Sequence, residues 1–176
     1  NLTSTGANTM GTLTMGGTLT TQTILPDTNT SYDIGSSSKQ YNTVHAKATS
    51  AQYADLAERY HAGSPIEAGT VVLFGGENEI EASNEDASTR VAGIISTAPA
   101  FMMNKDAGSD DAYPYVALAG RVPCKVTGEI RKGDMLVSAA NGHAKASAFV
   151  GGAMIGKALE DFNGESGTIE IAVNLM

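Results

Sequence analysis

The chain has 176 residues, of which 41% are apolar and 17% charged, and its formal net charge is −8 with an isoelectric point near 4.7. It contains no run of about 18 apolar residues and no recognisable signal peptide, so we expect no membrane insertion. An acidic chain also disfavours nucleic-acid binding, because phosphate neutralisation supplies most of that affinity. The first residue is Asn rather than Met, which indicates a fragment or a processed product.

Residues 1–26 carry no charged side chain and contain a short repeat. The run Met10-Gly-Thr-Leu-Thr14 returns as Met15-Gly-Gly-Thr-Leu-Thr20. Thr favours strands, and Gly favours turns or kinks. Two interpretations follow. The segment is either a flexible linker, or a fibre shaft that three chains wind about a common axis with Leu13 and Leu19 pointing inward.

Residues 27–63 predict a turn-rich collar followed by one short helix. Turn-forming residues cluster at 27–31 and 35–38 and flank short strand-like runs. Within 49–60, a Ser/Thr-x-x-Glu/Gln capping box precedes a helical periodicity. The side chains expected on one face of this helix, packed on the next domain or around a symmetry axis, are Tyr53, Leu56, Ala57 and Tyr60.

Residues 64–176 predict a β-rich head, because short β-prone runs alternate with Gly, Asn and Asp. Asn141-Gly142 is a strong signal for a β-hairpin. Many short strands with frequent turns favour a small β-barrel or a β-clip. The expected strands are 70–74, 79–82, 91–96, 115–119, 122–127, 135–138, 144–146, 153–158 and 167–175.

A weak internal repeat runs through this head. Gly69 and Gly133 are 64 positions apart and open similar runs, Ala68-Gly-Thr-Val-Val-Leu73 and Lys132-Gly-Asp-Met-Leu-Val137. Ala82-Ser83 and Ala146-Ser147 have the same spacing, and Gly93 and Gly156 follow at 63 positions. Two packed copies of one hairpin unit would explain the match, and chance similarity of short runs is the alternative.

The collar resembles a motif of tailed-phage tail fibres. Residues 25–46 read LPDTNTSYDIGSSSKQYNTVHA, which is similar to the pattern P-D-x-D/N-x-x-Y-D-L/I-G-S-x-x-x-R/Q-F/Y/W-x-x-I/V-x-A. Residues 51–60, AQYADLAERY, resemble the segment that often follows it. The resemblance implies the distal part of a homotrimeric fibre, after its repetitive shaft.

The head carries a second resemblance. Residues 69–104, above all RVAGIISTAPA at 90–100, are similar to the C-terminal domain of phage pre-neck appendage proteins. That group is classed as a glutamic-type autopeptidase and intramolecular chaperone. The resemblance therefore implies a domain that directs trimer folding and is then cut away, and it assigns no catalytic residue in this chain.

The residues that could carry chemistry have structural explanations. Glu79 and Glu81 would share one face of a strand, where a raised carboxyl pKa could activate water, although a solvated face is the commoner outcome. Ser109-Asp110 lacks a following Lys for a Ser-Lys mechanism. Cys124 is expected to be a buried thiol. The three histidines are far apart in sequence, so we expect no metal site and no cofactor.

Two loops offer apolar or aromatic groups for a receptor or for another subunit. They are 97–115 and 139–152, and their candidate contact residues are Phe101, Met102, Met103, Tyr113, His143 and Phe149. The run at 101–103 also fits an anchor between subunits. The candidates for a trimer axis are Leu13, Leu19, Tyr53, Leu56 and Tyr60.

The sequence thus predicts an all-β chain: a trimeric β-fibre shaft at 1–26, a collar with one short helix at 27–63, and a small β-barrel or β-clip-like head at 64–176. The expected function is structural. It is the C-terminal part of a homotrimeric phage tail fibre, made in the host cytoplasm and carried in the virion. Its expected partners are further copies, upstream fibre segments and a host-surface glycan or protein. The alternatives are a self-cleaving chaperone domain and, less well supported, a glycan hydrolase.

Overall fold

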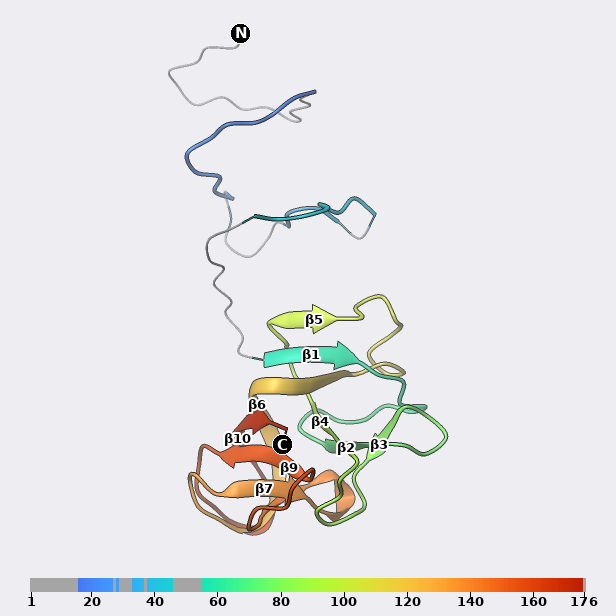
Figure 1. Cartoon of the computed structure of the whole chain (residues 1–176), viewed down its shortest axis with the longest axis vertical. Coiled ribbons are helices and arrows are strands. Elements are labelled where there is room, and N and C mark those ends of the chain that lie inside the picture. Colours follow the sequence, from blue (N-terminus) through green and yellow to red (C-terminus); the bar gives the residue numbers. More distant parts are fainter. Residues whose placement is uncertain (1–15, 27, 29–32, 37, 46–54, 176) are drawn as a thin grey trace. The chain divides into compact units, whose positions relative to one another are not determined.

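The computed structural model describes residues 16–26, 28, 33–36, 38–45 and 55–175. The chain divides into two units, residues 1–47 and 48–176 (Figure 1). In the first unit, the described residues form one isolated bridge, in which Ser36 and Lys39 exchange backbone hydrogen bonds of 3.0 and 3.2 Å. This bridge confirms the turn that the sequence predicts around Gly35. Leu13 and Tyr53 lie outside the described residues.

The second unit is all-β, as predicted. Its described residues contain one turn of 3₁₀ helix, at Ala140–Gly142, and no α-helix. The strands are β1 (Asp55–Arg59), β2 (Val71–Phe74), β3 (Ile80–Ala82), β4 (Val91–Ile95), β5 (Phe101–Met103), β6 (Tyr115–Ile130), β7 (Met135–Ser138), β8 (Ala144–Ala146), β9 (Met154–Ala158) and β10 (Phe162–Asn174).

Five strands close into a barrel. Around the barrel the order is β10, β9, β7, β8 and β6, and β6 returns to pair with β10. The β7–β8 hairpin turns at Asn141 and Gly142, whose φ angles are 58° and 70°, as the Asn-Gly signal predicts. The small contact between β6 and β8 is parallel and joins Val126 to Ala144. Closure removes free strand edges from this half of the unit.

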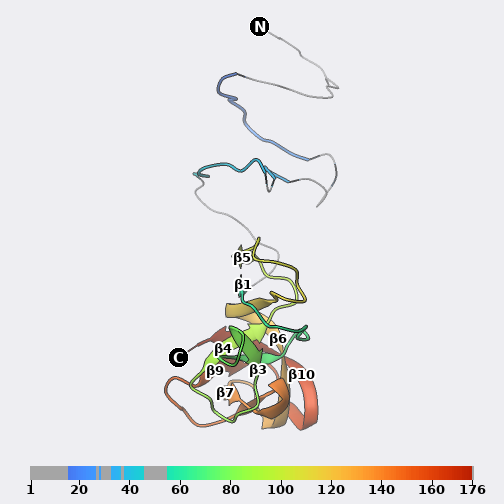
Figure 2. The ribbon, with the colours of Figure 1, turned by 90° about the vertical axis from the view of Figure 1, so that its right-hand side faces the viewer.

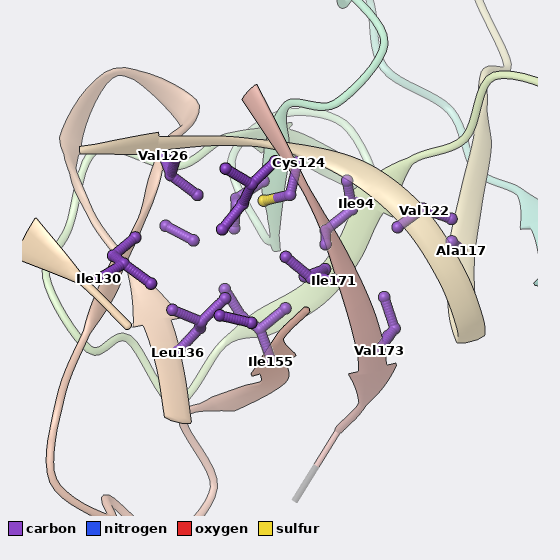
Figure 3. Close-up of a cluster of buried hydrophobic side chains, with 14 residues drawn as sticks. Ile94, Ala117, Val122, Cys124, Val126, Ile130, Leu136, Ile155, Ile171 and Val173 are labelled. Carbon is purple, nitrogen blue, oxygen red and sulfur yellow. The ribbon is translucent and has the colours of Figure 1, made fainter. Parts of the chain in front are cut away.

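The barrel interior is the main hydrophobic core (Figure 3). Side chains from β6, β7, β9 and β10 point toward one another there, and Leu136, Ile155 and Ile171 are fully buried. Cys124 lies in the same cluster. Its complete burial confirms the prediction of a buried thiol, and burial raises the pKa of that thiol to about 12. A smaller cluster packs beside β2, β3 and β4.

The internal repeat is confirmed by strand register. Val72 pairs with Ala82 in β2–β3, and Leu136 pairs with Ala146 in β7–β8, 64 positions later in each strand. The backbone NH of Gly69 donates to Ile95 O at 2.8 Å, and that of Gly133 donates to Ala158 O at 2.9 Å.

The strands that flank each hairpin also match between the two repeats. In the first repeat β1 precedes the hairpin and pairs antiparallel with the first half of β6. In the second repeat the last half of β6 precedes the hairpin and pairs antiparallel with β10. The strand β6 therefore belongs to both repeats. This explains why one strand stands where the sequence predicts two: Gly120 pairs with Val173 and does not end the strand.

The predicted helix at 49–60 is wrong over its described part. Residues 55–59 form β1, which pairs with β5 on one side and β6 on the other. Burial alternates along it: Asp55, Ala57 and Arg59 are buried, whereas Leu56 is exposed. Helical spacing would place Leu56 and Ala57 on one face. Backbone pairing with two neighbours outweighs the weak helix propensity of a single short segment.

Candidate docking surface

The clearest difference between the two repeats is an insertion. Residues 96–114 separate β4 from β6 in the first repeat, whereas only residues 159–161 separate β9 from β10 in the second. The insertion contains β5, which lies parallel to β1 with Leu56 opposite Phe101 and Glu58 opposite Met103. Figures 1 and 2 both place β1 and β5 at one end of this unit and β7 at the other.

The strand β5 is an open and apolar edge. Among the described strands it pairs only with β1, so no described strand covers its other backbone edge. Phe101, Met102 and Met103 are 55%, 47% and 37% exposed, although successive residues point to opposite faces of a strand. Leu56 on β1 is exposed next to them. We call Leu56 and residues 101–103 the β5 edge. An exposed apolar strand edge is normally avoided unless something covers it.

Buried Arg59 holds the far end of the insertion. Its Nη2 donates to Asp110 Oδ1 at 2.5 Å, and its Nη1 donates to Tyr113 O at 2.5 Å. The guanidinium lies 4.1 Å from the centroid of the Tyr115 ring, which is a cation–π arrangement. One strand residue thus fixes two points of a loop that lies more than 50 residues later in the sequence.

Buried Asp55 holds the near end. Ser96 Oγ donates to Asp55 Oδ2 at 2.6 Å, and the backbone NH of Ala100 donates to Asp55 O at 2.9 Å. Asn104 Nδ2 also donates to Arg59 O at 3.3 Å. The side chains of Asp55 and Arg59 therefore face inward and fasten the insertion, while Leu56 and Glu58 lie on the opposite face of β1. The result is a short strand held in place before any partner arrives, which suits docking.

The sequence prediction missed these anchors. Asp55 and Arg59 were placed off the expected helical face, and their partners lie 41 to 54 residues away. No local signal marked this strand. Residues 55–59 read DLAER, in which two apolar and then two charged residues follow one another, so the period-two pattern of a half-buried strand is absent.

The receptor-contact candidates fall into two groups. Phe101, Met102, Met103 and Tyr113 all belong to the insertion, and the Tyr113 ring lies 4.9 Å from the His61 ring. His143 and Phe149 belong to the second repeat. His143 bridges the β7–β8 turn and β10, with Nδ1 2.8 Å from Asn141 O and Nε2 2.9 Å from Ser166 Oγ. Phe149 is exposed in the loop between β8 and β9.

The trimer-axis candidates that the structure describes also lie in different surroundings. Leu19 is exposed in the first unit, and Leu56 is exposed on the β5 edge. Tyr60 is half-buried and packs against the second core, with its ring 5.3 Å from that of Phe74. Its hydroxyl donates to Glu58 Oε2 at 2.8 Å. Burial, followed by the hydrogen bond to Glu58, raises the pKa of Tyr60 to about 12.

The carboxylates considered for peptidase chemistry each have another partner. Glu79 Oε2 accepts the backbone NH of His61 at 2.7 Å. Glu81 Oε1 lies 3.4 Å from Nη1 of Arg90, which also binds Glu85. Within the part of the chain that the structure describes, no three His, Cys, Asp or Glu residues are placed to hold a metal ion. No described helix is long and apolar enough to cross a membrane.

Comparison with known proteins finds a shared fold. No family model and no curated protein matches the chain. A crystal structure of the bacteriophage phi29 gene product 12 C-terminal fragment matches with a TM-score of 0.52 and 15% identity, over 68% of this chain and 100% of that one. Pre-mature phi29 gene product 12 matches with a TM-score of 0.58 and 14% identity, over 75% of this chain and 23% of that one. The phi29 head fiber gp8.5 N base matches with a TM-score of 0.42 and 14% identity, over 68% of this chain and 93% of that one.

The all-β second unit thus has a fold also found in a C-terminal fragment of a phage protein. The chain spans about a quarter of the length of pre-mature gene product 12. At these identities, the likeness concerns the fold alone.

Proposed function

We propose that this chain is a structural component of a bacteriophage virion, the C-terminal part of a tail fibre or appendage that assembles as a homotrimer. Its fold likeness to a C-terminal fragment of a phage protein supports the class. The tail-fibre motif at residues 25–46 supports the fibre. The proposed partners are two further copies of the chain and the fibre segments upstream of it.

One observation carries the trimer: the first unit has no apolar core of its own among its described residues. Every large apolar side chain described there is between 54% and 85% exposed. These side chains are Leu19, Ile24, Leu25, Ile34, Tyr41 and Val44. Burying each would contribute about 1.5–3 kcal/mol, which a single chain forgoes and an assembly of chains recovers. Short Gly/Thr repeats that cannot bury an apolar face alone gain it from neighbours.

Host attachment is the second part of the proposal, and the second repeat offers the better surface for it. Phe149 is an exposed aromatic residue on a loop. His143 lines a groove of about 470 Å³ with Lys145, Asp86 and Glu165. The mixed charges of this groove suit a polar surface ligand such as a glycan, and Phe149 adds an exposed aromatic ring outside the groove lining. The alternative function, a self-cleaving chaperone domain that directs trimer folding, has no catalytic residue assigned to it in this chain, so structural assembly is the function proposed.

Light scattering on a sizing column tests the assembly. A homotrimer of 18.1 kDa chains should give a mass of roughly 54 kDa at micromolar concentration. Replacing Ile24 and Leu25 together with Ser should shift the mass toward the monomer, whereas Thr21→Ser, a change at an exposed polar site of the same unit, should not. A monomer of the unaltered chain at all concentrations would exclude the proposed trimer.

A further inference from the structure

We propose that the β5 edge is the contact by which the heads of neighbouring copies pack against one another. This inference rests on the proposed function, since it names the surface that a homotrimer uses. The partner is a second copy of this chain, and the contact consists of the apolar side chains of Leu56 and residues 101–103.

The barrel does not need β5. The second repeat closes its sheet with only three residues between β9 and β10. The first repeat carries 96–114 at the corresponding place, and every residue of β5 is exposed. An insertion that leaves Phe101, Met102 and Met103 largely in solvent gains little stability from apolar burial in an isolated chain. It is retained most simply if another surface covers it.

The edge is also held rigidly. Asp55 fixes Ser96 and Ala100, and Arg59 fixes Asp110 and the backbone of Tyr113. Both anchors are buried. A strand fixed at both ends loses little conformational entropy on docking, so more of the gain from apolar burial remains as binding free energy.

Charge favours a second copy as the occupant. The chain has 19 acidic and 11 basic residues, so two copies repel each other over most of their surface. Residues 91–104 contain no charged side chain, and β5 lies at the end of this run. The one carboxylate on this face of β1, Glu58, lies opposite Met103 and accepts a hydrogen bond from the Tyr60 hydroxyl. Two copies that meet through Leu56 and residues 101–103 therefore bring together fewer like charges than elsewhere on this acidic chain. An interface core depleted in charge and rich in Phe and Met is typical of association between proteins.

Connectivity points the same way. Strand β5 pairs with β1. Among the described strands, β1 is the first that follows the first unit along the chain. If the first units assemble as proposed, they hold three copies of β1 together at high effective concentration. In a three-fold assembly a β5–β5 strand pair would impose a two-fold relation, so we infer side-chain packing of the edges about the axis.

Thiol protection in the full chain tests this contact. Cys124 is fully buried, so Phe101→Cys introduces the reactive thiol at the edge. Phe149→Cys is the matched control: it is the same substitution at a similarly exposed site, 63% against 55%, in the other repeat. In the assembled protein, we expect a maleimide carrying a polyethylene glycol chain to label position 101 at least tenfold more slowly than position 149. A short bis-maleimide should cross-link copies through position 101 only.

The outcomes separate the two proposals. Equal labelling of both positions in a protein that is a trimer by light scattering would overturn the inference and leave the trimer standing. An unaltered chain that is monomeric would overturn both. Loss of the trimer in Phe101→Cys but not in Phe149→Cys would support the edge. As a second measurement, Phe101→Ser combined with Met102→Ser should weaken association about tenfold or more, and circular dichroism should show an unchanged head.

Discussion

Arg59 shows how one buried side chain can hold a functional surface. Its guanidinium binds Asp110 and the backbone of Tyr113 and lies over the Tyr115 ring. The side chain of Asp110 is 84% exposed, so the value of the pair comes less from its charge than from ordering the loop. The remaining donor, Nε, is buried and has no hydrogen-bond partner among the residues that the structure describes. Asp55 provides the complementary anchor at the other end of the insertion.

Removing this cation should loosen the insertion. We expect Arg59→Met to lower the free energy of unfolding by about 2 kcal/mol, because the buried hydrogen bond to Tyr113 O and the ring contact are lost. Amide exchange should accelerate within residues 104–114. The control is Arg131→Met, because Arg131 is 78% exposed and pairs with Glu129 in solvent. Its cost should stay below about 0.5 kcal/mol. Equal losses in urea titrations of both variants would contradict the anchoring role.

The buried thiol of Cys124 should make the folded chain lose stability in alkali. Its thiol pKa is raised from 9.0 to about 12 by burial, so the unfolded chain releases this proton before the folded one. The contribution is fully present below pH 9 and disappears as the pH rises toward 12, at about 1.4 kcal/mol per pH unit. Urea titrations from pH 8 to 11 should show a shallower decline for Cys124→Ala than for the unaltered chain. Parallel declines would show that Cys124 does not titrate in this way.

Some strands could be predicted from the sequence and others could not. Strands of the repeats were predicted well because their signals are local: β7 and β8 match residue for residue, and Gly69 and Gly133 mark equivalent turns. The strands β1 and β5 were missed because both depend on distant pairing: β1 pairs with β5 and β6, and β5 pairs with β1. The pair Leu56 and Phe101 is separated by 45 positions, and neither strand has more than five residues.

Equivalent elements should respond alike to equivalent substitutions. Gly93 and Gly156 lie at matching bulged pairings, and a Cβ on either would overlap a carbonyl oxygen of the next strand, that of Ala117 or Ala172. Because those oxygens belong to paired backbone, the strand must shift. Gly93→Ala and Gly156→Ala should each cost about 3 kcal/mol. Gly151→Ala would meet only ordinary contacts and should cost well under 1 kcal/mol. Chemical denaturation of the three variants checks this, and a harmless Gly93→Ala would argue against the equivalence.

The two units of the chain differ in how much of their apolar surface they bury. The second unit has buried cores and a closed barrel, whereas the described residues of the first unit leave their large apolar side chains exposed. The contrast was expected from composition, because an uncharged Gly/Thr segment cannot fill a core and a β-prone head can. The predicted boundaries after residues 26 and 63 stay predictions. The apolar surface that the insertion adds could not be predicted from composition, since it depends on contacts between residues that are far apart in the sequence.

The net charge of the chain should make the stability of the trimer depend on salt. Each chain carries a formal charge of −8, so three copies repel one another at neutral pH. If uncharged surfaces hold the trimer, salt screens the repulsion without weakening the contacts, and raising ionic strength from 10 to 150 mM shortens the screening length to about 8 Å. The dissociation constant from sedimentation velocity should therefore fall severalfold. Arg131→Glu, which adds negative charge at an exposed site, should steepen this dependence. A trimer that dissociates as salt rises would show that ion pairs between copies hold it.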